Sequence, residues 1–253
     1  MGTFNLPETG QKRTIVELRN QIRAWGRGAF ADSPDIRSTG CAALDALFSN
    51  QGVRPGSLVE WLGDGDASGA GTVSLIAGCQ VCPEGRPVVL IDPRGDLFPL
   101  SLSLLGFDLS RLVLIRPASG REALWACEEA LRCEAVGVVW ANIERIASTD
   151  FRRLRLAAEE SRGIGFLVRS AKAVPQPSWA EVRLKVHPRP SRRGSPRFRV
   201  ELASTHGRPR RSTADILIDS LKGMLHEDTH PANSLPLVSR MDAATAACRS
   251  TGA

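Results

Sequence analysis

The chain has 253 residues, 42% of them hydrophobic, and a formal net charge of +6. This apolar fraction is enough to bury a core and excludes a wholly disordered chain, and no run of 18 or more apolar residues indicates a membrane span. The N-terminal run MGTFNLPETGQKRT has no apolar stretch of the kind that a secretory signal contains, so we expect a cytoplasmic protein. The six cysteines are dispersed, and the CxxC pair Cys79 and Cys82 has no second pair at zinc-binding spacing. We therefore expect cysteines packed in the core and no metal site.

Residues 1–35 are expected to form an N-terminal helix and its lead-in. Within 14–27, apolar residues recur at helical spacing, at Ile15, Leu18, Ile22 and Trp25. Such an amphipathic helix packs on the main fold or docks a partner, and the sequence leaves both readings open.

Residues 36–220 are expected to form one core domain, which opens with a short helix within 38–50. Strands and helices then alternate. The predicted strands are 57–62, 86–93, 111–117, 135–142 and 163–170, and the predicted helices are 72–81, 99–106, 120–133 and 149–162, the last with Thr149 or Asp150 as its N-cap. The continuous apolar runs at 86–93 and 111–117 are typical of strands that are covered on both faces. The pattern predicts an α/β fold with a mostly parallel sheet and helices on both faces.

After Pro175 the pattern changes from continuous apolar runs to alternating apolar and polar residues. Segments 181–188 and 196–204 alternate apolar and polar residues, which predicts an antiparallel hairpin added to the sheet edge, and 213–219 is a candidate for one more strand. Residues 221–253 are rich in Pro, Ser and Ala with weak periodicity, and we expect a flexible tail there.

Basic residues are concentrated in the hairpin region. From Arg183 to Arg211 there are ten Lys and Arg and one acid, Glu201, so the rest of the chain sums to −3. Such a segment favours contact with nucleic acid or with an acidic protein, and the alternative is a solvated hairpin kept soluble by arginine. Only Phe198 is interleaved, which does not support a stacking platform for single strands. The candidate basic surface consists of Arg189, Arg192, Arg193, Arg197, Arg199, Arg208, Arg210 and Arg211.

A glycine-rich loop at 63–71 follows a predicted strand and precedes a predicted helix, which is the architecture of a phosphate-binding loop. A working loop needs glycine, four residues, glycine, then Lys and Ser or Thr, so that the Lys pairs with the phosphates and the hydroxyl holds Mg²⁺. Here five residues lie between the two outer glycines, and the Lys position holds Ala. The residues of this degenerate loop are Gly63, Gly65, Gly69, Ala70, Gly71 and Thr72. Asp64 and Asp66 add negative charge where phosphates would lie.

Two further positions also lack the residues that nucleotide hydrolysis needs. Arg94 stands where an acid often activates water after the second strand, and Asn142 stands where a Mg²⁺-organising Asp ends the third strand. Asp92, Asp96 and Glu144 remain nearby as replacements. We therefore expect no catalytic residues, no enzymatic activity and no cofactor, while weak ATP binding stays open as an alternative.

The run from Ile36 to Asn142 resembles the core of the RecA recombinase family. The similar stretches are IRSTGCAALDALFSNQGVRPGSLVEWLG, IDPRGDLFP and LGFDLSRLVLIRPASGREALWACEEALR. Within this superfamily the chain is most similar to the ImuA family, in its length, N-terminal helix, AAEESRGIGFLVR segment and basic hairpin with FRVELASTHGRPR. The similarity covers roughly residues 14–219.

This resemblance implies a RecA-type core and an accessory role in translesion DNA synthesis during the bacterial SOS response, with the protein in the cytoplasm and at the nucleoid. The implied partners are an ImuB-like Y-family polymerase homologue, a replicative-type error-prone polymerase, and RecA itself. The leading hypothesis is a non-catalytic adaptor for these proteins. The alternatives are an ATP-binding RecA-like repair enzyme with a divergent phosphate loop, and a DNA-binding module that uses the basic hairpin.

Overall fold

The computed structural model describes residues 35–192, 194–207, 209–219 and 222–229. The predicted helix at 14–27 and the end of the predicted tail, 230–253, lie outside these residues. No helix within the described part of the chain is both long and apolar enough to cross a membrane.

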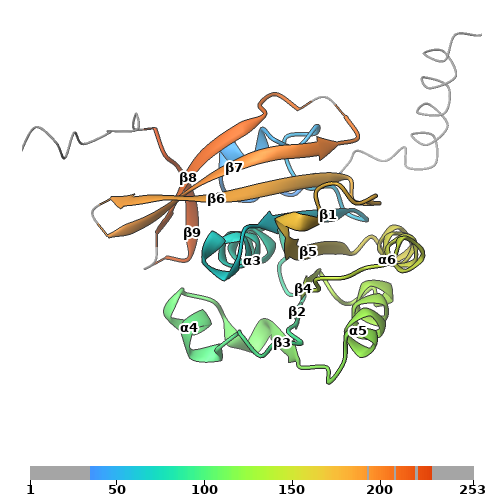
Figure 1. The fold of residues 1–253 in the computed structure, drawn as a ribbon. Helices are drawn as coiled ribbons and strands as arrows, with labels where there is room; N and C mark the ends of the chain where they lie inside the picture. Colours follow the sequence, from blue (N-terminus) through green and yellow to red (C-terminus); the bar gives the residue numbers. More distant parts are fainter. Residues whose placement is uncertain (1–34, 193, 208, 220–221, 230–253) are drawn as a thin grey trace, which may run out of the picture.

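The fold is built on one nine-stranded sheet with the strand order β3-β2-β4-β5-β1-β6-β7-β8-β9 (Figure 1). The strands are β1 (Leu58–Gly63), β2 (Val88–Ile91), β3 (Leu112–Ile115), β4 (Val138–Asn142), β5 (Ile164–Ser170), β6 (Val182–Arg192), β7 (Ser195–Thr205), β8 (Thr213–Asp219) and β9 (Met224–Glu227). The pairings from β3 to β6 are parallel, and those from β6 to β9 are antiparallel. The predicted α/β fold class, with a mostly parallel sheet and an antiparallel C-terminal hairpin, is confirmed.

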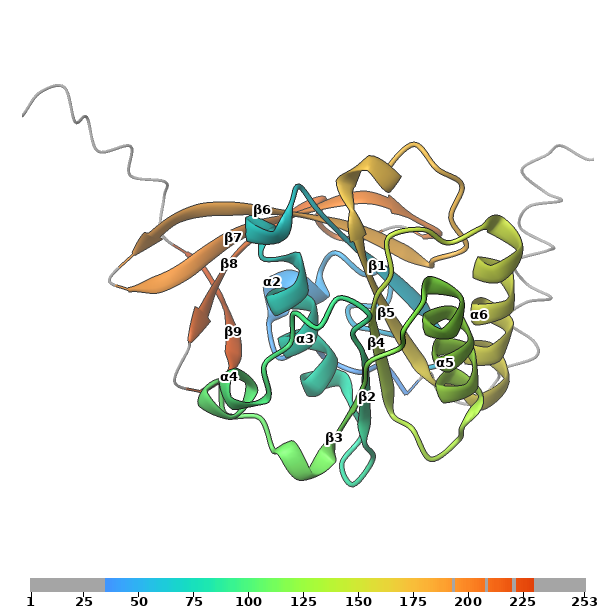
Figure 2. The ribbon, with the colours of Figure 1, turned by 60° about the horizontal axis from the view of Figure 1, so that its bottom comes forward.

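Helices cover both faces of the parallel strands. They are α2 (Ala42–Asp45), α3 (Ala70–Val81), α4 (Pro99–Leu104), α5 (Gly120–Arg132) and α6 (Ser148–Ser161). Figure 2 shows α2 and α3 on one side of β1, β4 and β5, and α5 and α6 on the other. Each side has its own apolar core: Trp61 and Phe166 pack at 5.5 Å between ring centroids on the α3 side, whereas Phe151 and Leu131 are buried on the α5 and α6 side.

Three local predictions were wrong. β3 is an edge strand and not a covered one, and Val113 is 46% exposed, because a continuous apolar run does not reveal whether a second neighbour follows. α6 begins at Ser148 after Ala147, so neither Thr149 nor Asp150 is its N-cap. Part of the predicted tail at 221–253 is the ordered strand β9, where a single buried residue, Leu225, leaves no periodic signal.

The connection between β5 and β6 has an unusual construction. These strands flank β1 and run parallel to it, and such crossovers are usually made by a helix. Here residues 171–181 form the crossover, with only a 3₁₀ turn at Ala171–Ala173. In a helix the backbone carbonyls accept hydrogen bonds from N–H groups of the same helix. An irregular segment that packs on a sheet lacks these bonds, so its buried carbonyls need other donors.

A buried ion network supplies those partners. The fully buried carboxylate of Glu60 on β1 accepts from Arg169 on β5 at 2.6 Å, from Arg183 on β6 at 2.5 Å and from Ser178 at 2.7 Å. The Arg183 guanidinium also donates to three carbonyls of the crossover, those of Ala173, Val174 and Gln176. The network therefore joins three adjacent strands and holds the crossover against them.

We predict that Glu60→Gln lowers the free energy of unfolding by about 3–5 kcal/mol, because removing one partner leaves two buried guanidinium groups without compensation. Urea unfolding of the full chain measures this change. Glu129→Gln, at an exposed position on α5 that pairs with Arg132, is the matched control and should cost less than about 1 kcal/mol. Equal stability of the two variants would contradict the assigned role of Glu60.

Candidate functional site: a degenerate phosphate loop and a neutralised basic face

The glycine-rich loop connects β1 to α3, as predicted. β1 ends at Gly63, a 3₁₀ turn spans Asp66–Ser68, and α3 begins at Ala70 after Gly69. Gly65 and Gly69 have φ values of +81° and +80°, a region that glycine adopts without steric cost. The short turn takes up the extra residue, so the loop keeps the strand–loop–helix arrangement with an altered interior.

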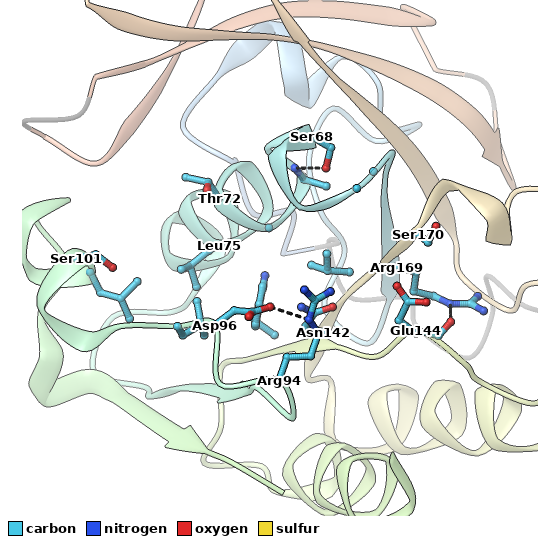
Figure 3. Close-up of a pocket in the computed structure, with 18 of the residues that line it drawn as sticks. Ser68, Thr72, Leu75, Arg94, Asp96, Ser101, Asn142, Glu144, Arg169 and Ser170 are labelled. Carbon is cyan, nitrogen blue, oxygen red and sulfur yellow. Dashed lines mark hydrogen bonds and ion pairs between the residues drawn. The ribbon is translucent and has the colours of Figure 1, made fainter. Parts of the chain in front are cut away.

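A cavity of about 490 Å³ lies beside this loop and brings the predicted positions together. Its lining includes Gly63, Gly65, Ala70, Gly71, Thr72, Arg94 and Asn142, with Gly69 adjacent in the chain. Figure 3 shows Arg94 and Asp96 joined by their ion pair beside Asn142, while Ser68 and Thr72 lie on the loop and the first turn of α3. The sequence pattern thus located one real pocket at the carboxyl end of the strands, the usual place for ligands in such sheets.

The chemistry of the loop differs from that of a phosphate cradle. Ala70, at the Lys position, is buried and offers no charge. Its N–H group points to the Ser68 hydroxyl at 3.4 Å, a long contact, and the Ser68 side chain is itself buried. A Cβ atom on Gly63 would lie 2.0 Å from the Ser68 hydroxyl, so this side chain packs directly on the strand end. A serine of the chain occupies the inside of the loop.

The acids near the pocket are committed to other partners or lie at its rim. Asp92 is fully buried and accepts from the N–H groups of Gly95 at 3.0 Å and Leu97 at 2.8 Å, so it shapes the turn after β2. Asp96 pairs with Arg94 at 2.8 Å. Glu144 is exposed at the pocket rim. Of the three predicted replacement acids, Asp92 and Asp96 hold other groups of the chain, whereas Glu144 is exposed at the rim.

Sequence reasoning missed Trp140 and Arg169 as pocket residues. Trp140 lies under the first turn of α3 and donates its indole N–H to Ser74 at 2.8 Å, which gives the cavity an aromatic floor. Arg169 lines the pocket while its charge is balanced by Glu60. The sequence did contain a signal for both residues, because Trp140 and Arg169 carry polar groups in strand segments that are mostly apolar.

The two cysteines of the CxxC pair lie at the end of α3. Burial raises the pKa of the Cys79 thiol to about 12 and also raises the pKa of Cys82, so both are protonated near neutral pH. Within the described residues, no group of three or more His, Cys, Asp or Glu side chains is arranged to hold a metal ion.

The candidate basic surface is divided by the structure. Arg197 pairs with Asp228, Arg199 holds Asp215 at 2.7 and 2.8 Å, and Arg211 pairs with Glu227 at 2.6 Å. The bidentate hydrogen bonds from Arg199 hold the pKa of Asp215 below its ordinary value. Acids from β8, β9 and the residue after β9 therefore neutralise much of the segment.

Two of the remaining arginines of the candidate basic surface lie at exposed positions. Arg189 and Arg210 are exposed. Arg193 and Arg208 lie outside the described residues, as does the side chain of Arg192. The concentrated charge that the sequence showed is thus lower on the folded face, because its counter-charges come from later in the chain.

Comparison with known proteins agrees with this geometry. The family model for the RecA N-terminal domain matches residues 19–149. The chain is 32% identical to the RecA protein of Nostoc sp. (strain PCC 7120) over 144 residues, which is 54% of this chain and 40% of that protein. It is 29% identical to RecA of Rhodopirellula baltica over 146 residues, which is 55% of this chain and 38% of that protein.

These matches cover about two fifths of each curated relative. The family-model match spans β1, the loop, α3 and the strands through β4, which supply most of the pocket lining, while Arg169 and its neighbours on β5 lie beyond it. With half of its residues matched by the family model and the expected parallel sheet present, the chain belongs to the RecA N-terminal domain family.

Proposed function

We propose that this protein is a non-catalytic RecA-like accessory protein that acts as an adaptor in translesion DNA synthesis. The observation that supports an adaptor is an exposed apolar strip beside the altered pocket. The strip is formed by Phe98, Leu100 and Leu104 at α4, which are 63%, 58% and 72% exposed. Leu109 in the 3₁₀ turn before β3 and Val113 on the β3 edge strand are exposed as well. Exposed apolar patches and unpaired edge strands are typical of protein–protein contact sites.

The proposed partners are an ImuB-like Y-family polymerase homologue, a replicative-type error-prone polymerase, and RecA. The similarity of this chain to the ImuA family, in its length, its AAEESRGIGFLVR segment and its C-terminal hairpin, supports this choice. The loss of the Lys position at Ala70 and of the acid positions at Arg94 and Asn142 supports a role that needs no nucleotide turnover. A family core can keep its shape and its contact surfaces while its chemistry changes.

We predict that Leu100→Asp with Leu104→Asp abolishes co-purification with an ImuB-like polymerase homologue, because the charges make burial of the apolar strip costly. Pull-down of the co-expressed full-length proteins measures this loss. Leu156→Asp on α6, where Leu156 is 52% exposed, is the matched control and should retain the partner. Retention of the partner by the double variant would show that the strip is not the contact surface.

The repair-enzyme alternative makes a different prediction. A ligand that binds only the folded state raises the melting temperature, by an amount set by its concentration relative to Kd. We expect no rise in the melting temperature of the full chain at millimolar Mg-ATP, because the loop has no Lys and its interior holds Ser68. A concentration-dependent rise of several degrees would favour the enzyme alternative.

DNA binding through the hairpin is the second candidate function, and the exposure of Arg189 and Arg210 favours it. If both contact phosphates, Arg189→Ala with Arg210→Ala should reduce the slope of log affinity against log salt by about 2. Fluorescence anisotropy with duplex DNA across a salt series measures this slope. Arg121→Ala, at an exposed position on α5, is the control. An unchanged slope in the double variant would remove the hairpin from DNA contact.

A further inference from the structure

The β6–β7 hairpin lies directly against the phosphate-type loop. β6 pairs with β1 along its length, with Gly63 opposite Val186, so the hairpin continues past the point where the loop begins. The next residues of β6 pair with the middle of β7, where Pro188 is opposite Phe198. The hairpin therefore presents side chains to the loop from the neighbouring strand position.

Phe198 makes the closest of these contacts. Its ring packs on Gly69 so tightly that a Cβ atom there would lie 2.0 Å from Cε1 and 2.7 Å from Cζ. The ring is 9% exposed and belongs to the α3-side core. Position 69 needs glycine for two reasons: its φ is positive, and the Phe198 ring leaves no room for a Cβ atom. Phe198, which lies outside the loop, therefore fixes the residue that precedes α3.

Two polar contacts complete the arrangement. Lys185 on β6 pairs with Asp64 in the loop at 3.2 Å between Nζ and Oδ2. Ser68 fills the inside of the turn between Gly63 and Ala70. The start of the loop at Asp64 and its end at Gly69 therefore each have a partner in the hairpin, while Ser68 packs within the loop itself.

We propose that the β6–β7 hairpin is the internal organiser of this loop, and that it holds the loop in the ordered arrangement that bound phosphates impose in a nucleotide-dependent protein. Backbone amides and glycines leave such a loop poorly determined by local structure, so an ordered loop needs a ligand or a packed neighbour. Here Phe198 and Lys185 are that neighbour. The loop and the hairpin form one cooperative unit that requires no nucleotide. This inference does not depend on the adaptor role, because it concerns only contacts within the chain.

Amide hydrogen exchange of the full chain without nucleotide tests this proposal. We expect residues 68–73 to be protected in the unaltered protein, because the N–H groups of Ser68 and Val73 donate to the carbonyls of Gly65 and Gly69. Phe198→Ala should raise their exchange rate by about tenfold or more, together with that of β6 and β7. The matched control is Phe151→Ala, which empties a buried aromatic site in the other core. It should raise exchange around α5 and α6 and change the rate at 68–73 by less than about twofold.

A second pair of variants avoids any failure of Phe198→Ala to fold. Lys185→Met keeps the apolar stem and removes the ion pair with Asp64, so exchange at residues 68–70, where Ser68 donates to Gly65, should rise about threefold. Lys172→Met, at an exposed position on the crossover, should leave these residues unchanged. The proposal is overturned if both lysine variants exchange alike at 68–70, if Phe198→Ala affects the loop no more than Phe151→Ala, or if loop protection in the unaltered protein requires Mg-ATP.

Discussion

The carboxylate of Glu60 is the interaction on which the arrangement of this molecule depends. It lies with no solvent exposure in β1 and is shared between Arg169 and Arg183, which come from the strands on either side. A buried charge of this kind is favourable only when its partners are complete, so the three strands must adopt one register together. That register places the end of β1, where the loop begins, opposite the middle of β6, from which the hairpin continues. The crossover at 171–181 can dispense with a helix because Arg183 accommodates its carbonyls.

With the strands fixed, the pocket and the basic face have a common explanation. The interior of the loop is filled by Ser68, its start is paired with Lys185, and its end is covered by Phe198. On the face of the hairpin that carries Lys185, opposite to that of Phe198, Arg197 and Arg199 are paired with Asp228 and Asp215. Pairs within the chain thus balance the charge of Asp64 at the loop and part of the arginine charge on β7.

Much of the fold could be predicted from the sequence because apolar runs and glycine loops are local signals. The continuous apolar runs in RPVVLIDP and GIGFLVRS predict buried strands, and β2 and β5 lie within these segments. The sequence pattern placed Ala70, Arg94 and Asn142 at positions of one phosphate-loop motif, and all three line one cavity. The edge position of β3, the strand β9 and the pairing of Arg199 with Asp215 could not be predicted, because each depends on a neighbour distant in sequence. Counting arginines in one segment does not reveal which acids from other segments will pair with them in the fold.

The position of β1 in the sheet has a consequence for how the chain reaches its native state. Glu60 finds its two arginines 109 and 123 residues later in the sequence, and both hydrogen-bonded neighbours of β1 belong to that later part. During synthesis, β1 therefore emerges from the ribosome long before either neighbouring strand exists. Its segment Leu58–Leu62 has open edges until β5 and β6 have been synthesised, which exposes it to association with other chains. Folding of this protein is governed by closure of long loops and should be slow for a domain of its size.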